Sequence, residues 1–387
     1  MAWPLTLGTL AALSLVLGLW QWLAARRFPL HRRVPDPGFA PPLTVLKPLK
    51  GVDATTRECL RSWFTQDYPG PVQLLFAVDD AADPAAGLVR RLLAEFPEAD
   101  AALHVCEDPA GANRKVAKLA LLTSRAKHDL LLLSDADVWA PPDLLAQVVL
   151  PLRHAAIGLV TCLYRLSRPD SPATTWETVA VNADFWSQVL QARSLRPLDF
   201  ALGAVIITRA SALREAGGFA AFQDCLADDY QLGRRLAQRG HGIELCPVVV
   251  ECRSGPQTGR AVWRHQLRWA RTIRVCRPVP YFLSQLANGT LWPLLALLAQ
   301  PPGPVAAFCG ACIVMRIVLA LDLVRRLEGA SRRVSGVAWI GRALQVPVKD
   351  LLQAVLWVCA FLGNRIEWQG ETFRLRRDGT LEPVGKV

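Results

Sequence analysis

The chain of 387 residues carries a formal net charge of +11, and 52% of its residues are hydrophobic. With a mean hydropathy of +0.22, this composition excludes an ordinary soluble protein and predicts a membrane component. The excess of arginine indicates partners that carry phosphate, either lipid headgroups or a nucleotide, and no nucleic acid is expected as a partner.

The first segment, residues 1–25, contains no charged side chain and is long enough to cross a bilayer. Basic residues follow it at Arg26, Arg27, Arg32 and Arg33, which is typical of the cytoplasmic side of a membrane helix. A cleaved signal peptide is the alternative, but its charge should precede the apolar run. We therefore predict an N-terminal transmembrane anchor at 1–25 and a basic, Pro-rich linker at 26–42.

Short apolar runs then alternate with helix-like segments over residues 43–277. This alternation predicts one cytoplasmic α/β domain with a largely parallel sheet and flanking helices. The expected strands are 43–46, 72–78, 102–106, 130–133, 157–161, 203–208 and 243–250. The expected helices are 55–65, 84–95, 114–124, 141–150, 174–190 and 228–238.

A second uncharged stretch begins at Pro278, and a Pro/Gly cluster at residues 301–304 divides it into two apolar halves. We predict a membrane helical hairpin over 278–326. The segment 327–363 ends in an apolar run, Leu351–Gly363, which is too short to span and is expected to lie in the interface or to re-enter. Residues 364–387 form a C-terminal tail. The protein is thus expected to be a multi-pass integral membrane protein.

The most informative motif is an apolar run, 130–133, that leads into Asp135 and Asp137. Ligands of open α/β sheets bind at the carboxyl edge, where these acids are expected to lie. Asp135 and Asp137 are predicted to hold Mg²⁺ or Mn²⁺, whose remaining positions take phosphate oxygens. An isolated Asp-x-Asp is more often a turn or a helix cap, and its place after a buried strand favours the metal site.

Two further acidic motifs also precede helices. Asp79 and Asp83 are predicted to bind the base or ribose of a nucleotide donor, although Asp83 with Pro84 is equally typical of a helix cap. Asp228 and Asp229 open an amphipathic segment, where structural capping is again the alternative. A transfer to a hydroxyl needs a carboxylate that accepts the proton, and Asp229 is the candidate general base.

A block of arginines precedes the membrane hairpin. Within it, residues 260, 264, 268 and 271 share one helical face that is expected to compensate pyrophosphate charge, and a solvated basic face is the alternative. Trp269 is expected either to stack on a sugar or to lie at the level of the lipid headgroups. His265, Gln266, Arg271 and Asp228 are assigned to acceptor or phosphate binding.

The order Asp83, Asp135, Asp229 and Arg268-Trp269 resembles the D, D, D, (Q/R)xxRW series of processive-type glycosyltransferases with the GT-A fold. The chain is more closely similar to the ceramide glucosyltransferase family. Its segments 45–53 and 373–380 also resemble that family, so the likeness covers nearly the whole chain. The motifs are specific as an ordered set rather than singly.

This resemblance implies a GT-A nucleotide-sugar-binding fold, with a mixed and mainly parallel sheet, and inverting transfer of glucose from UDP-glucose to the primary hydroxyl of ceramide. Asp83 would then contact the nucleotide, and Asp135 the metal and diphosphate. Arg268 and Trp269 would bind donor phosphate or acceptor, and Lys47, in the opening strand, would bind the donor. The sequence carries no indication of oligomeric state.

His265 is a departure, because it stands where the family has Gln or Arg, with Gln266 beside it. Bacterial transferases that add an N-acetylhexosamine to hopanoid lipids are similar in residues 161–165 and 265–269, which gives an alternative substrate pair. An alternative of another class is a non-catalytic membrane protein that binds nucleotide sugars or lipid.

Overall fold

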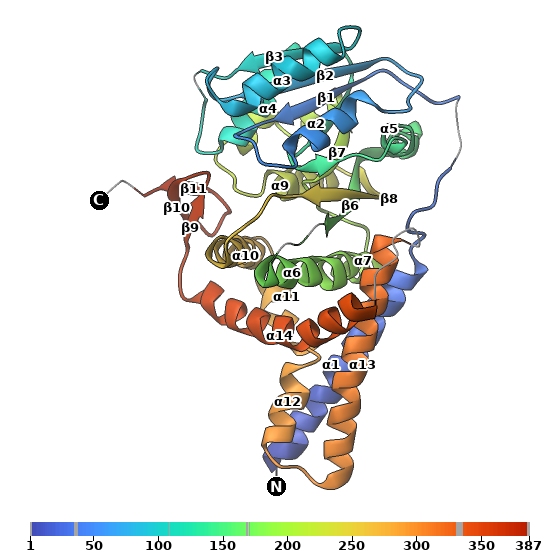
Figure 1. The fold of residues 1–387 in the computed structure, drawn as a ribbon, viewed down its shortest axis with the longest axis vertical. Helices are drawn as coiled ribbons and strands as arrows, with labels where there is room; N and C mark the ends of the chain where they lie inside the picture. Colours follow the sequence, from blue (N-terminus) through green and yellow to red (C-terminus); the bar gives the residue numbers. More distant parts are fainter. Residues whose placement is uncertain are drawn as a thin grey trace.

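A mixed sheet organises the upper half of the molecule, and apolar helices form the lower half (Figure 1). The computed structural model describes residues 2–34, 38–107, 109–167, 169, 171–329 and 336–384. Residues 35–37 of the predicted linker lie outside the described residues. The predicted anchor therefore joins the sheet through a segment that the structure describes only in part.

Eight strands of the described chain form the large sheet, in the order β3-β2-β1-β4-β7-β6-β8-β5. The β1–β2, β2–β3, β1–β4 and β6–β8 pairs are parallel, whereas β7 and β5 run antiparallel to their neighbours. This confirms the predicted mixed, mainly parallel sheet. The bounds are β1 (Leu43–Pro48), β2 (Val72–Val78), β3 (Asp100–Val105), β4 (Leu130–Ser134), β5 (Val138–Trp139), β6 (Ile157–Ser167), β7 (Val205–Arg209) and β8 (Gly242–Arg253).

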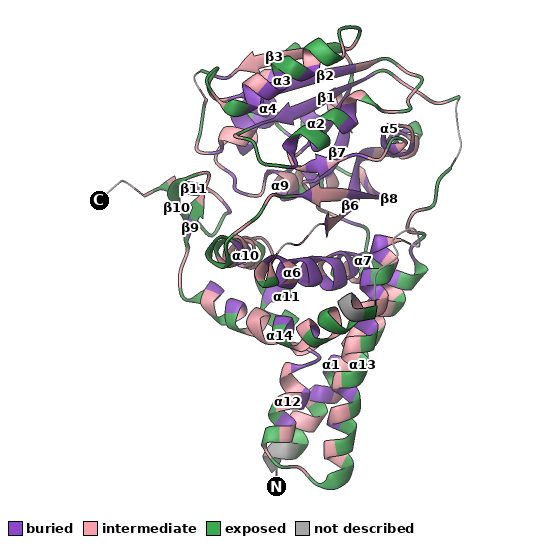
Figure 2. Cartoon of the chain, viewed as in Figure 1, coloured by how far each residue is buried: buried purple, intermediate pink, exposed green. Residues whose placement is uncertain are grey.

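Helices cover both faces of this sheet, and the central strands are buried between them (Figure 2). Every residue of β1 and β4 is buried, which explains why β4 reads as a continuous apolar run rather than as an alternating pattern. Five predicted helices appear, four of them at nearly the expected bounds, whereas α5 covers only 5 residues of the predicted 141–150. They are α2 (Thr56–Phe64), α3 (Pro84–Glu95), α4 (Arg114–Arg125), α5 (Leu144–Val148) and α9 (Asp228–Gln238).

The predicted helix 174–190 is wrong as one regular helix. It is divided into α6 (Pro172–Val179), a π-helical turn η2 (Ala180–Phe185) and α7 (Trp186–Leu195). The short α8 (Ala210–Glu215) and the 3₁₀ turns η1 (Leu150–Arg153) and η3 (Phe219–Phe222) were not predicted, because such short elements carry no readable periodicity.

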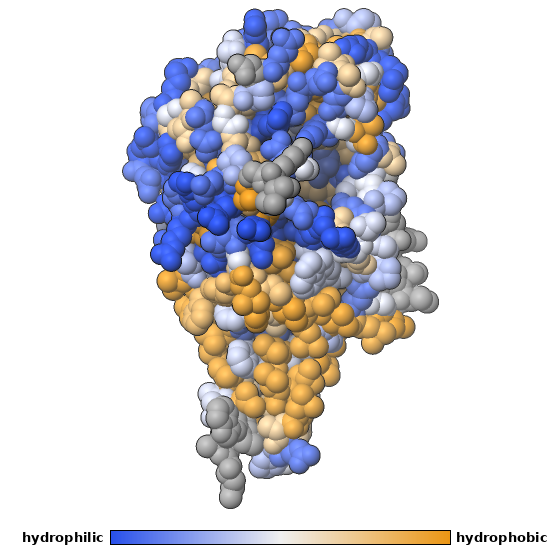
Figure 3. Space-filling model, turned by 90° about the vertical axis from the view of Figure 1, so that its left-hand side faces the viewer, coloured by the Kyte–Doolittle hydropathy of each residue, from blue (hydrophilic) through white to orange (hydrophobic). Residues whose placement is uncertain are grey.

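Three helices are long and apolar enough to cross a membrane, at Leu5–Arg27, Gly303–Glu328 and Trp339–Phe361. They belong to α1 (Ala2–Arg27), α13 (Gly303–Glu328) and α14 (Gly336–Phe361). Figure 3 shows the apolar surface that these helices give to the lower half. In Figure 1, α14 lies across α13, whereas α1 and α13 run alongside each other.

The predicted membrane hairpin needs correction in its first half. That half is broken into α11 (Pro278–Leu283), the 3₁₀ turn η4 (Ser284–Ala287) and α12 (Leu291–Leu298). With 8 residues, α12 is about 12 Å long and cannot span a bilayer. It instead packs between α1 and α13, where Ala11, Ala296 and Cys309 form a small buried cluster.

The final apolar helix is also longer than expected, because α14 extends far upstream of Leu351. Its span includes Lys349 and Asp350, which are 1% and 2% exposed. Charged residues of this kind break an apolar pattern in sequence, yet here they face protein rather than lipid. By length and composition, the segment that was predicted to be too short is long enough to span.

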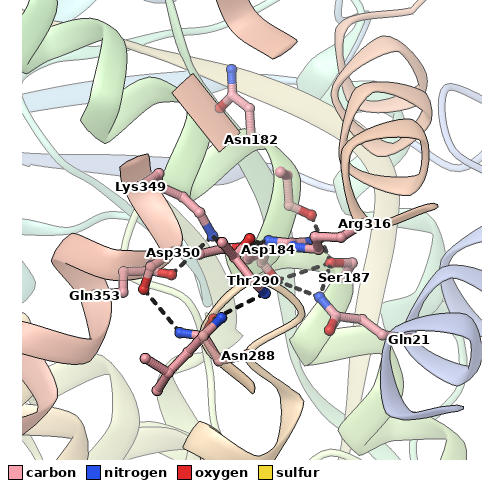
Figure 4. Close-up of polar contacts among 12 residues, drawn as sticks. Gln21, Asn182, Asp184, Ser187, Asn288, Thr290, Arg316, Lys349, Asp350 and Gln353 are labelled. Carbon is pink, nitrogen blue, oxygen red and sulfur yellow. Dashed lines mark hydrogen bonds and ion pairs between the residues drawn. The ribbon is translucent and has the colours of Figure 1, made fainter. Parts of the chain in front are cut away.

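Four charged side chains, three buried and one nearly so, join the apolar helices to the half of the molecule that contains the large sheet (Figure 4). Arg316 of α13 lies 2.8 Å from Asp184 of η2 and 2.9 Å from Asp350 of α14. Lys349 contacts both acids, and Thr290 donates to Asp350 at 2.7 Å. We call Asp184, Arg316, Lys349 and Asp350 the ionic joint. Its two cations and two anions balance, so each partner offsets the desolvation of the others.

The predicted tail folds into a second, antiparallel sheet of β9 (Arg365–Trp368), β10 (Glu371–Leu375) and β11 (Leu381–Pro383). This sheet covers Leu226, directly before α9. The amide of Leu226 donates to the carbonyl of Gly379 at 3.2 Å, and the amide of Leu381 donates to Asp224 at 2.7 Å. The end of the chain therefore fixes the start of α9. The bounds of the neighbouring helix α10 are Gly259–Cys276.

Neutralising one member of the ionic joint is expected to destabilise the protein strongly. Asp350→Asn leaves two buried cations with one anion, and loss of one partner in a buried pair costs about 3–5 kcal/mol. The control is Asp322→Asn, because Asp322 on α13 pairs with Arg26 and Arg326 at a site that is 33% exposed, where about 1 kcal/mol or less is expected. The measurement is thermal unfolding in detergent, and equal losses in both variants would contradict the prediction.

Candidate active site

Three segments bring charged side chains to the carboxyl edge of the sheet. Asp135 follows β4 directly, Asp228 and Asp229 open α9, and Lys115 lies in the first turn of α4. The Lys115 Nζ is 2.7 Å from Asp135 Oδ1 and 3.4 Å from Asp228 Oδ2. One ammonium therefore holds carboxylates from two different elements, and the predicted metal ligand lies beside the predicted base segment.

Gly203 lies between Asp135 and Asp229. A Cβ placed on Gly203 would be 2.9 Å from Asp229 Oδ2 and 3.7 Å from Asp135 Oδ2. The other oxygen of Asp229 accepts a hydrogen bond from the amide of Tyr230 at 2.7 Å. Because only a residue without a side chain fits between these two carboxylates, they border the same small space.

Burial and neighbouring charges shift the pKa values of these groups. Burial, followed by the charge of Asp228, raises the pKa of Asp229 to about 6, against the opposing effect of Lys115. Burial and the charge of Asp135 likewise raise the pKa of Asp137 to about 6, while Lys47 opposes this shift. Burial alone would lower the pKa of Lys115, but Asp135 and Asp228 outweigh it and raise that pKa. The site thus favours an additional positive charge.

The carboxylates fit a cation whose other ligands come from a substrate. No group of three or more His, Cys, Asp or Glu side chains that could hold a metal occurs among the described residues. Asp135 and Asp137 are close enough for the charge of Asp135 to raise the pKa of Asp137. Magnesium sites often use one or two carboxylates together with phosphate oxygens. The donor set present therefore suits a phosphate-dependent site rather than an all-protein cage.

Lys47 does not lie where a donor could touch it, which corrects its assignment to donor binding. Its side chain is fully buried, stacks over Trp63 and donates to the backbone carbonyl of Asp135 and, at 3.2 Å, to Ser134 Oγ. Burial lowers the pKa of Lys47 to about 8. Lys47 therefore supports the segment that carries Asp135 from behind.

Helix α10 contributes Arg268 and Trp269 to the site. Burial lowers the pKa of Arg268, and the charges of Asp135 and Asp229 oppose this shift, which places its guanidinium near both acids. Trp269 packs against Tyr164 and Phe185, with ring centroids 6.5 Å and 5.9 Å apart. Tyr164 interacts with the charges of Asp229 and Asp135, so Trp269 belongs to an aromatic wall beside the acids.

His265 and Gln266 share one partner, Glu177 of α6. His265 Nδ1 lies 2.7 Å from Glu177 Oε1, and Gln266 Nε2 donates to the same oxygen at 2.8 Å. Gln266 is buried, so its side chain anchors α10 to α6. His265 also meets the Trp269 ring edge-on, with centroids 4.8 Å apart. Acceptor contact thus remains a prediction for His265, whereas Gln266 is a structural anchor.

Arg271 lies apart from this site, which corrects its assignment to phosphate or acceptor binding. Its guanidinium donates to the carbonyl of Arg365 in β9, and Arg264 forms an ion pair with Glu367 of the same strand. The predicted basic face of α10 is therefore divided. Arg268 faces the acids, while Arg264 and Arg271 hold the C-terminal sheet.

The remaining acids that were predicted for the site are Asp79, which follows β2, and Asp83, which precedes α3. Asp83 caps α3 through the amide of Ala85 at 2.8 Å and accepts from the amide of Gly51 at 3.0 Å, so its predicted alternative as a helix cap is confirmed. Asp79 Oδ2 pairs with Lys118 at 2.9 Å. Asp79 Oδ1 is buried without a hydrogen-bond partner among the described residues. A donor contact stays a prediction for both acids.

Sequence reasoning missed Lys115, Gly203 and Glu177. Lys115 carries a signal, because Asn113 caps α4 and a cation in the first turn of a helix opposes the helix dipole. Such a lysine needs an acidic partner, and the Asp motifs supply it. Gly203 and Glu177 carry no local signal, since their importance depends on residues that are distant in sequence.

Comparison with known proteins places these residues in context. A family model described as "Glycosyl transferase family 21" matches residues 6–381. The chain is 36% identical over 121 residues to a ceramide glucosyltransferase of Candida albicans, covering 28% of this chain and 22% of that protein. It is 25% identical over 261 residues to an N-acetylglucosaminyltransferase of Mesorhizobium japonicum, covering 65% and 59%. The chain spans 22% to 48% of the first three ceramide glucosyltransferases that it matches.

A solved structure also supports the fold. The mannosyltransferase PcManGT from Pyrobaculum calidifontis, solved with GDP-Man and Mn²⁺, matches with a TM-score of 0.56 and 21% identity. The match covers 90% of this chain and 99% of that one. The expected GT-A glycosyltransferase fold is thereby confirmed.

A methyl group at position 203 is expected to disturb the site, because it would push Asp229 away from its present position. Gly203→Ala should lower the free energy of unfolding by about 1–3 kcal/mol, as overpacking does elsewhere. Gly87→Ala in α3 is the matched control, since its Cβ would meet only the Arg91 side chain at 3.8 Å and a helical alanine should stabilise by about 0.5–1 kcal/mol. Thermal unfolding measures both, and a Gly203→Ala protein as stable as the wild type would contradict the prediction.

Proposed function

Because the chain belongs to glycosyl transferase family 21, we propose that it transfers glucose from UDP-glucose to the primary hydroxyl of ceramide at a membrane surface. The observation that carries this proposal is the meeting of Asp135, Asp229 and Arg268 in one site above the apolar helices. Ceramide glucosyltransferases among the relatives support the choice of substrate.

In this proposal, Asp229 is the general base. It accepts the proton of the lipid hydroxyl while the hydroxyl oxygen attacks the anomeric carbon and the bond to the diphosphate breaks. Its pKa of about 6 makes it a stronger base than an ordinary aspartate, yet it is still ionised at neutral pH. A single displacement of this kind inverts the anomeric centre and forms no covalent intermediate.

The other charged residues serve the donor. Arg268 and Lys115 offset the growing negative charge of the leaving diphosphate. Asp135 and Asp137 would hold Mg²⁺ or Mn²⁺, which supplies Lewis-acid stabilisation of the leaving nucleoside diphosphate when bound. The buried, unpartnered oxygen of Asp79 supports a hydrogen bond to the donor at that position.

The arrangement of the helices supports a lipid acceptor and a cytoplasmic catalytic domain. Arg26 at the end of α1 and Arg326 at the end of α13 both pair with Asp322, so these basic helix ends lie together. Figure 1 places these ends beside the sheet domain. Basic flanks favour the cytoplasmic side, and α10, the helix that carries Trp269, packs against the apolar helix α14.

A second candidate is transfer of N-acetylglucosamine to a hopanoid-type lipid. The N-acetylglucosaminyltransferase of Mesorhizobium japonicum supports it, because that alignment covers 65% of this chain. A non-catalytic protein that binds nucleotide sugars or lipid is the alternative of another class. The raised pKa of Asp229 beside Arg268 favours catalysis, because such perturbed groups cluster at active sites.

The identity of the glycolipid product distinguishes these candidate functions. The purified full chain in liposomes should convert UDP-glucose and ceramide into a hexosylceramide, detected by mass spectrometry of the extracted lipids. Parallel reactions contain UDP-N-acetylglucosamine and a hopanoid polyol in each combination. An N-acetylhexosaminyl hopanoid as the main product would replace the first candidate by the second. Absence of any glycolipid in all combinations, from protein that binds the donor, would support the non-catalytic alternative.

Loss of the base should abolish transfer and leave the donor in place. Asp229→Asn is expected to reduce turnover about 10²–10⁴-fold, whereas UDP-glucose affinity by calorimetry changes little. Asp378→Asn is the control, since Asp378 is an exposed turn residue that bonds to Thr380. In the wild type, turnover should rise as the pH passes about 6, because Asp229 must be ionised. Wild-type turnover by Asp229→Asn would remove Asp229 from the mechanism.

A further inference from the structure

Lys115 occupies an unusual position in the acidic site. Its side chain is 20% exposed, and its Nζ bonds to both Asp135 and Asp228. Asp135 is also a carboxylate that is expected to bind the divalent cation. An ammonium 2.7 Å from that carboxylate therefore competes for the same oxygen, because a metal ion and an ammonium repel each other at such short range.

The first turn of α4 does not by itself favour this cation. The helix dipole disfavours positive charge at an N-terminus. The preceding residue, Arg114, extends in another direction and lies 3.6 Å from Glu371 of β10. Lys115 points at the acids because their attraction outweighs burial and the dipole, and this attraction raises the pKa of Lys115.

The balance of charge in the site has a consequence for its ligands. Four carboxylates, of Asp135, Asp137, Asp228 and Asp229, lie among three cationic side chains, Lys47, Lys115 and Arg268. A divalent cation that arrives alone at Asp135 meets the Lys115 ammonium, which already pairs with one oxygen of that carboxylate. A diphosphate that arrives alone is repelled by the negative charge of the carboxylates. When both arrive together, their charges compensate, and the displaced ammonium gains phosphate oxygens as new partners.

We propose that Lys115 is an internal counter-ion that keeps the acidic site closed to a lone divalent cation and so couples cation binding to donor binding. Without donor, its ammonium holds Asp135 and Asp228 together. With donor, Asp135 would be free to hold the cation, and the Lys115 ammonium would turn to the diphosphate oxygens. The inference rests on the proposed function, because it takes a nucleoside diphosphate as the ligand. Coupling of this kind is reciprocal, so each ligand raises the affinity for the other.

The test measures Mn²⁺ binding to the detergent-solubilised full chain by electron paramagnetic resonance, with and without UDP. The wild type should bind Mn²⁺ weakly alone and more tightly with UDP. Lys115→Met removes the competitor, so Mn²⁺ alone should bind about tenfold more tightly and the effect of UDP should shrink. Arg114→Met is the matched control, because it removes the same charge from the neighbouring residue of α4 and should leave both affinities unchanged.

A second variant keeps the test meaningful if Lys115→Met unfolds. Lys115→Arg retains the charge, so it should keep weak binding of Mn²⁺ alone. An Mn²⁺ affinity that is the same in wild type and Lys115→Met, or higher in Lys115→Arg than in wild type, overturns the proposal. A wild type that binds neither UDP nor UDP-sugars, even with Mn²⁺, would instead contradict the proposed function. The two failures are thus distinguishable.

Discussion

Repulsion among the carboxylates at the edge of the sheet is the constraint on which the site depends. Asp135 and Asp137 come from the end of β4, and Asp228 and Asp229 come from the start of α9. Burial, together with the charge of the neighbouring acid, raises the pKa values of Asp137 and Asp229. Lys115 supplies the shared cation between the two segments. One ammonium therefore offsets part of the negative charge that these two segments bring together.

Several neighbouring groups support the segments that carry these carboxylates. Lys47 holds the carbonyl of Asp135 from the buried side, Glu177 ties α10 to α6, and the C-terminal sheet holds the start of α9. Each support acts through a neighbouring group rather than on a ligand. Carboxylates that repel one another need such a frame, because they would otherwise turn toward water.

Much of the sheet and half of the site could be predicted from sequence. The buried strand before Asp135 and the amphipathic helix after Asp228 are local patterns, and both appear at the expected positions. Burial of Lys47 and diversion of Arg271 to β9 depend on the partners that tertiary packing brings. A pattern in sequence identifies a charged residue, but it does not identify which of several opposite charges will be its partner.

The apolar helices show the same limit of prediction from sequence. Lys349 and Asp350 interrupt the apolar pattern of α14, which made the spanning segment look shorter than the helix is. Their partners, Arg316 and Asp184, belong to two other elements, and the four charges become compatible with an apolar setting only in the assembled ionic joint. Hydropathy counts each charge separately, whereas the folded chain buries them as a neutral group.

The position of the C-terminal sheet has a consequence for how the protein matures on the ribosome. Chains emerge from their N-terminal end, so α13 and α14 are synthesised before β9–β11. The strands that secure Asp224 and Leu226 beside α9 therefore become available only after both apolar helices have left the exit tunnel. The start of α9 therefore acquires its contacts with the C-terminal sheet only after both apolar helices have been synthesised.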